Sequence, residues 1–166
     1  MKSIIASVLC LVFVGLANAQ LKPPTESVMD RFLRYVKIDT QSQEDQTTTP
    51  STRKQLNLAN MLAKELTALG AQNVRVSEFG IVYATVPGNI ADNTKVPVIG
   101  FIAHMDTSPA VSGENVNPII HKNYQGGDIT LPKDPTQVIL AEKTPAFKAL
   151  IGDDIITADG TTLLGS

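Results

Sequence analysis

A nearly unbroken apolar run, Pro97 to Ala103, constrains the fold of this chain more than any other segment. The run has the length of a β-strand, and a strand without alternating polar positions is typical of a sheet that is covered on both faces. Such a sheet needs helices above and below it, so the run predicts an α/β domain. It leads directly into His104-Met105-Asp106.

Two helices are predicted before this run. Apolar residues recur at helical spacing over residues 27–37 and 51–69. Ser27 and Ser51 are suitable N-terminal caps for these helices, and Gly70 is a suitable stop for the second. The polar stretch between the two helices is expected to be a loop.

Strand signals follow the second helix. Two β-rich runs, 73–77 and 81–87, predict a hairpin. Near the end of the chain, a short helix is expected over 144–150, and residues 155–164 are expected to form a second hairpin around Asp159-Gly160. These elements predict a mixed β-sheet flanked by helices.

The N-terminus has the pattern of a signal peptide. Lys2 precedes the apolar run Ile4 to Leu16, and Ala17-Asn18-Ala19 has the small residues that signal peptidase recognises. A buried helix or a membrane anchor is the alternative, but a membrane span takes roughly 20 apolar residues. We expect residues 1–19 to be removed before Gln20 and the product to be periplasmic or secreted, without a stable membrane anchor.

The mature chain, residues 20–166, is long enough for one domain. Its net charge is small, since the whole sequence has 14 basic and 16 acidic residues and a formal charge of -2. This balance does not suggest a nucleic-acid partner. Cys10 is the only cysteine and lies within the predicted signal peptide, so catalysis by a thiol of the mature chain is excluded.

His104 and Asp106 are the candidate site residues. In a strand, residues two apart point to the same face, so these two side chains are expected to lie together. They follow the apolar run at its carboxyl end, where open α/β sheets place their ligands. An imidazole is a good zinc ligand, and a carboxylate can hold its other nitrogen. A structural histidine fits the same pattern.

Other polar residues have simpler interpretations. His121 is expected to have a surface or structural role, and Asp153-Asp154 to form a solvated turn. Thr107 and Ser108 have no evident base partner, which favours hydrogen bonding within a loop. Gly126-Gly127 is followed by neither a lysine nor a helix start, so it predicts a turn rather than a phosphate-binding loop.

Several segments together resemble the peptidase T branch of the M20 zinc peptidases. The most specific are His104-Met105-Asp106-Thr107-Ser108-Pro109 and Tyr124-Gln125-Gly126-Gly127-Asp128. Further matching segments occur in the family's order and spacing and cover nearly all of the mature chain: Lys37-Ile38-Asp39-Thr40-Gln41-Ser42, Pro50-Ser51-Thr52, Thr157-Ala158-Asp159-Gly160 and Leu163-Leu164-Gly165.

The resemblance implies a role for each candidate residue. His104 matches a zinc ligand, and Asp106 matches the catalytic-site carboxylate that orients and polarises it. Two zinc ions are implied for the full-length enzyme, but the other ligands and the general base of the family come after Ser166. The chain therefore corresponds to a C-terminally truncated, partial M20-type catalytic domain. Alone, it is expected to bind zinc weakly at most and to be inactive.

The resemblance implies a metallo-aminopeptidase that releases the N-terminal residue from short peptides, above all tripeptides, by metal-activated water. The resemblance allows homo-oligomers only in the full-length form and does not fix the oligomeric state. A dipeptidase or an amino-acid deacylase of the M20 type is the alternative within the family. A non-catalytic exported remnant is the alternative from another class.

Overall fold

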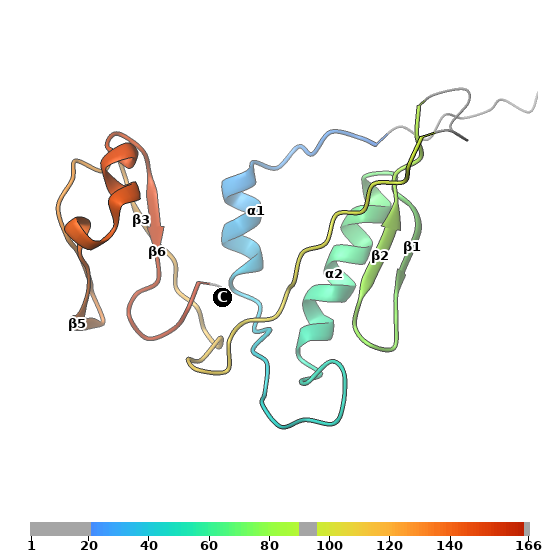
Figure 1. Cartoon of the computed structure of the whole chain (residues 1–166), viewed down its shortest axis with the longest axis horizontal. Helices are drawn as coiled ribbons and strands as arrows, with labels where there is room; N and C mark the ends of the chain where they lie inside the picture. The colour runs from blue at the N-terminus through green and yellow to red at the C-terminus, as the bar shows by residue number, and fades with distance from the viewer. Residues whose placement is uncertain (1–20, 90–95, 165–166) are drawn as a thin grey trace, which may run out of the picture.

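The computed structural model describes residues 21–89 and 96–164 (Figure 1). The predicted signal peptide and its cleavage site at Gln20 lie outside these residues. The helices and strands of the described part, in chain order, are α1 (Val28–Tyr35), α2 (Gln55–Ala68), β1 (Gln72–Val76), β2 (Val82–Thr85), β3 (Ile119–His121), β4 (Ile129–Leu131), β5 (Asp134–Ile139), the 3₁₀-helices η1 (Ala141–Lys143) and η2 (Pro145–Leu150), and β6 (Ile155–Thr157). None of the helices within the described ranges combines the length and apolar character needed to cross a bilayer.

Helix α1 begins where the capping pattern predicts. The Ser27 hydroxyl accepts a hydrogen bond from the backbone N–H of Asp30 at 3.0 Å and donates one to the Asp30 carboxylate at 2.7 Å. The first of these bonds satisfies one of the backbone N–H groups that the first turn of a helix leaves without a partner. The expected helix over 27–37 is thus confirmed, with slightly shorter bounds.

Helix α2 begins later than expected. Its first residue is Gln55, and no side chain caps it. The Ser51 hydroxyl, predicted as the cap, instead accepts from the Gln55 side-chain amide at 3.2 Å, so the assignment of Ser51 as the cap is wrong. The C-terminal end is as predicted, because Gly70 has a positive φ of 93° and the Ala71 N–H returns to the Leu66 carbonyl.

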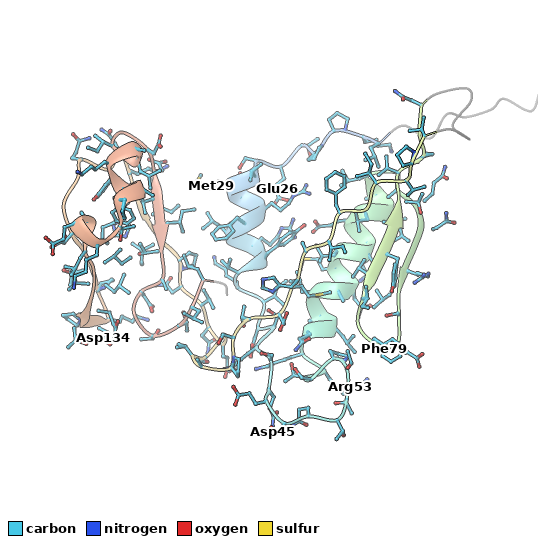
Figure 2. All side chains as sticks on the ribbon, viewed as in Figure 1. Glu26, Met29, Asp45, Arg53, Phe79 and Asp134 are labelled. Carbon is cyan, nitrogen blue, oxygen red and sulfur yellow. The ribbon has the colours of Figure 1, made fainter. Side chains whose placement is uncertain are left out.

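A charged cluster joins the two helices. Arg34 of α1 pairs with Glu26 at 2.6 Å, and with Glu65 of α2 at 2.5 Å; Glu26 is labelled in Figure 2. The Tyr35 hydroxyl donates to the other oxygen of Glu65. Burial raises the pKa of Glu65, but the bonds from Arg34 and Tyr35 outweigh burial and hold this pKa below its usual range. The cluster therefore fixes α1 against α2 through charged groups.

Helix α2 packs on the expected hairpin. Strands β1 and β2 are antiparallel, with Arg75 opposite Tyr83, and the Arg75 guanidinium lies 3.8 Å from the centre of the Tyr83 ring. Leu58 and Ala59 of α2 are buried, and Figure 1 shows α2 alongside β1 and β2. Phe79 marks the turn between the strands in Figure 2.

The segment Pro97–Ala103 is not the predicted buried strand. It belongs to no helix or strand, and Val98, Phe101 and Ile102 are 98%, 97% and 99% exposed. Hydrophobic pattern indicates which segments favour burial, but a strand also needs a neighbour that shares its backbone hydrogen bonds. In the described part of the chain, the strands form three separate antiparallel pairs. The α/β class holds, whereas the expectation of one mixed sheet between helices is wrong for these residues.

Strand β6 also has a different partner from the one expected. Residues 155–164 do not fold back on themselves, because β6 pairs with β3, which places Ile119 opposite Thr157 and His121 opposite Ile155. Asp159-Gly160 still forms a turn, with Gly160 at φ 105°. The helix expected at 144–150 is present as η2. Local sequence patterns thus predicted the turn and the helix, but they did not predict the pairing of β6 with β3.

Asp159 holds the C-terminal strands together and is 1% exposed. One carboxylate oxygen accepts from the Thr161 N–H at 3.0 Å and its hydroxyl at 2.6 Å. The other accepts from Asn117 at 3.3 Å and lies 3.0 Å from the Lys133 ammonium, between β4 and β5. The bonds from Thr161, followed by that from Lys133, hold the pKa of Asp159 far below its usual range.

Replacing Asp159 by asparagine should destabilise the chain in a pH-dependent way. Because folding lowers the pKa of Asp159, its contribution is fully present above the unfolded-state pKa of about 3.9 and is lost as the pH falls towards the folded-state value. Asp159→Asn should therefore lower the thermal midpoint strongly at pH 7, and the difference from the unsubstituted chain should shrink between pH 5 and pH 2. Glu114→Gln, at an exposed loop position, is the control. An equal difference at pH 7 and pH 2 would contradict this account.

Candidate functional site

His104 and Asp106 lie together, as the sequence predicts. His104 Nδ1 is 3.0 Å from the Asp106 carbonyl oxygen and 3.3 Å from its carboxylate oxygen Oδ1. The cause differs from the predicted one, since the two residues do not share a strand face but belong to an extended segment. The side chains are 65% and 45% exposed, so the imidazole is accessible from solvent.

The geometry of this pair favours one tautomer of the imidazole. Both neighbours of His104 Nδ1 are acceptors, so Nδ1 carries the proton and donates it. Nε2 then has a free electron pair, which is the form in which histidine binds a metal. The pair thus suits one metal-ligand position and the carboxylate that orients it.

The remaining polar candidates have structural roles. His121 lies in β3, with Nε2 2.9 Å from the Thr157 hydroxyl of β6. Asp154 pairs with Lys122 at the turn before β6, and Ser108 accepts from the Ala110 N–H within its loop. The Thr107 hydroxyl is different, because it is buried without a hydrogen-bond partner among the described residues; the expected loop bond of this hydroxyl is not formed. Gly126-Gly127 forms the expected turn, with both φ angles positive.

The residues after Asp106 are held by the loop that follows α1. Gln41 and Thr107 form an isolated parallel β-bridge. The Thr107 N–H donates to the Thr40 carbonyl at 3.2 Å, and the Ser42 N–H and hydroxyl donate to the Thr107 carbonyl at 2.9 and 2.8 Å. We call residues 39–42 together with residues 107–111 the clamp. Its second segment begins at Thr107, the residue directly after Asp106.

A pocket of about 480 Å³ lies beside the clamp. Its lining comes from both segments of the clamp and from the loop between residue 42 and α2: Gln41, Ser42, Gln43, Glu44, Thr52, Lys54, Pro109 and Ala110. Lys54, one of these lining residues, pairs with Asp39 at 2.8 Å. The described residues contain no group of three or more histidine, cysteine, aspartate or glutamate side chains that could hold a metal ion.

Comparison with known proteins identifies what this chain resembles. No family model matches it. A protein named Peptidase T from Listeria innocua is 49% identical over 141 residues, which are 85% of this chain and 34% of that protein. Proteins of the same name from Clostridium acetobutylicum and Desulfitobacterium hafniense are 50% and 54% identical over 141 residues, covering 85% and 84% of this chain.

The chain is a homologue of peptidase T. It spans about a third of the length of the curated relatives that it matches, and corresponds to their N-terminal portion. The resemblance to peptidase T drawn from the sequence is thus confirmed. The name of these relatives describes a peptidase, and the role of each residue of this chain is argued below from the structure.

Sequence reasoning missed the clamp of this peptidase T homologue. Gln41 lies in one of the segments that carry the resemblance, yet a single sequence does not show that its side chain contacts Pro109 and Val111, which are nearly 70 positions away. A hydrogen-bond pattern between two loops has no periodicity, so neither helical nor strand spacing could have revealed it.

Gly113, two residues beyond the clamp, lies close to both of its segments. A Cβ atom at this position would lie 2.9 Å from Asp39 Oδ1 and 3.1 Å from Thr107 Oγ1. Gly113→Ala should therefore push these two segments apart and lower the free energy of unfolding by about 1–3 kcal/mol, as overpacking of a filled site does. Gly100→Ala is the matched control, because a Cβ there would have no neighbour within 4 Å. Equal urea midpoints for the two variants would contradict the close approach.

Proposed function

We propose that this chain is the N-terminal part of a zinc-dependent aminopeptidase of the M20 type, which releases the N-terminal residue from short peptides, above all tripeptides. The homology to proteins named Peptidase T over 85% of the chain supports a peptidase. The observation that carries the metal assignment is the contact of His104 Nδ1 with Asp106, which leaves Nε2 available as a ligand.

The two residues have different roles in this proposal. His104 binds zinc through Nε2. Asp106 accepts a hydrogen bond from the Nδ1–H group, which fixes the orientation of the ring and increases the electron density at Nε2. Bound zinc supplies an activated water for attack on the peptide carbonyl. Asp106 also keeps the ring from turning Nδ1 towards the metal, because that nitrogen already donates its proton.

A catalytic zinc has about three protein ligands and a water, and the described residues supply one imidazole in a suitable arrangement. In this proposal, the remaining ligands and the general base belong to the other two thirds of the longer enzyme, outside the third that corresponds to this chain. We expect the 166-residue chain alone to bind zinc weakly and to hydrolyse no peptide.

Substitutions in the full-length enzyme test the two roles. His104→Ala removes a ligand and should abolish tripeptide hydrolysis and reduce the bound zinc by one ion. Asp106→Asn keeps the shape of the side chain but removes its charge, so zinc affinity or activity should fall by roughly 10- to 100-fold. Zinc content is measured by elemental analysis and activity by release of the N-terminal residue.

The control for these variants is His121→Ala. It breaks the bond to Thr157 and should lower stability by about 1 kcal/mol without changing the zinc content. Full activity of His104→Ala, or loss of zinc from His121→Ala, would show that the wrong histidine has been assigned to the metal.

We also propose that residues 1–19 direct export of the protein. The support is the basic residue Lys2, the apolar run Ile4–Leu16 and the small residues before Gln20. N-terminal sequencing of the periplasmic or secreted product should begin at Gln20. An intact Met1 on protein recovered from the cytoplasm alone would contradict export.

A further inference from the structure

The side-chain amide of Gln41, in the clamp, donates two hydrogen bonds to the same loop. Gln41 Nε2 donates to the Pro109 carbonyl at 3.2 Å and to the Val111 carbonyl at 3.0 Å. A glutamine amide has two N–H donors, so both are occupied by the loop that follows Asp106. The backbone of Gln41 is engaged as well, through its bridge to Thr107.

Two charged residues fix the orientation of this amide. Lys54 Nζ lies 3.3 Å from Gln41 Oε1 and 2.8 Å from Asp39 Oδ2. An ammonium group can only donate, so the Gln41 oxygen must face Lys54 and the NH₂ group must face the two carbonyls. Rotating the amide by half a turn would place NH₂ against the ammonium and oxygen against two carbonyl oxygens. Asp39 in turn accepts from the Gln41 N–H at 2.9 Å, which closes the network.

The position of the His104–Asp106 pair depends on where its segment is held. Residues 97–106 belong to no helix or strand of the described chain, so no regular backbone ladder sets their place. The chain is held at Thr107 by backbone bonds and at Pro109 and Val111 by the Gln41 side chain. These three points of attachment fix both the position and the direction of residues 107–111. Attachment at Thr107 alone would let residues 104–106 change their direction relative to the rest of the fold.

We propose that Gln41 is a positioning residue for the His104–Asp106 pair, and that Lys54 and Asp39 orient its amide. This inference rests on the proposed function, in which His104 binds zinc. In this proposal Gln41 is not itself a zinc ligand. It acts through the loop 107–111, by reducing the range of positions that the imidazole can take.

Gln41→Glu separates the two contacts of the side chain. Glutamate keeps an oxygen facing Lys54 and converts that contact to an ion pair, but it has no N–H for Pro109 and Val111. In the full-length enzyme we expect hydrogen exchange of the peptide covering residues 104–113 to be at least fivefold faster. Zinc affinity, measured by chelator competition, should fall about tenfold, the lower end of the range for residues that orient a ligand. The kcat should fall with KM unchanged, and the thermal midpoint should fall modestly, because a carboxylate oxygen would face the two carbonyl oxygens.

Gln46→Glu is the matched control, since it makes the same change at an exposed position of the same loop, and it should leave all four measurements unchanged. Lys54→Met is a second variant, which removes the orienting charge but keeps the Gln41 donors. It should also speed hydrogen exchange of residues 104–113 and weaken zinc binding, each by a smaller factor than Gln41→Glu. If Gln41→Glu does not fold, the result for Lys54→Met tests the positioning role instead.

The results distinguish this inference from the proposed function. Zinc binding by the unsubstituted enzyme with unchanged affinity in Gln41→Glu would overturn the positioning role, whether or not loop exchange is faster. Failure of the unsubstituted enzyme to bind zinc would overturn the proposed function instead. Faster exchange over residues 104–113 together with weaker zinc binding supports the inference.

Discussion

The contact between Gln41 and Thr107 links the two parts of the chain on which the candidate site depends. One partner lies in the loop after α1, and the other follows directly on Asp106. Charged groups hold α1 to α2 on one side of this contact, and Asp159 holds the C-terminal strands on the other. Figure 1 shows α1 with α2, β1 and β2 on one side and β3 and β6 on the other. Because few apolar side chains are fully buried among the described residues, polar contacts determine much of this arrangement.

The same contact explains how an exposed His-x-Asp pair can be a defined site. Regular strands usually place ligands at the ends of a sheet, but here the pair lies in an extended segment. Its geometry comes from local bonds of His104 to Asp106 and from attachment just beyond them. Homology to peptidase T over the matching third of that protein is consistent with a site whose other ligands come from elsewhere in a longer chain.

Local rules predicted much of the fold, and long-range pairing accounts for the errors. The cap at Ser27, the stop at Gly70 and the β1–β2 hairpin follow from interactions between near neighbours. The pairing of β6 with β3 joins residues 36 positions apart in sequence, as the His121–Thr157 bond shows, and no local pattern encodes it. Segment 97–103 has the composition of a buried strand, yet its burial depends on a partner strand. The adjacency of His104 and Asp106 was predictable because it needs only two residues of spacing, whereas Gln41 and Lys54 act across the fold.

The most direct test of the account is a crystal structure of the full-length enzyme with zinc, with the metal located by anomalous scattering. The account predicts His104 Nε2 at about 2.1 Å from zinc, Nδ1 directed at Asp106, and the Gln41 amide within hydrogen-bond distance of the Pro109 and Val111 carbonyls. Zinc bound through Nδ1, or located away from His104, would contradict it.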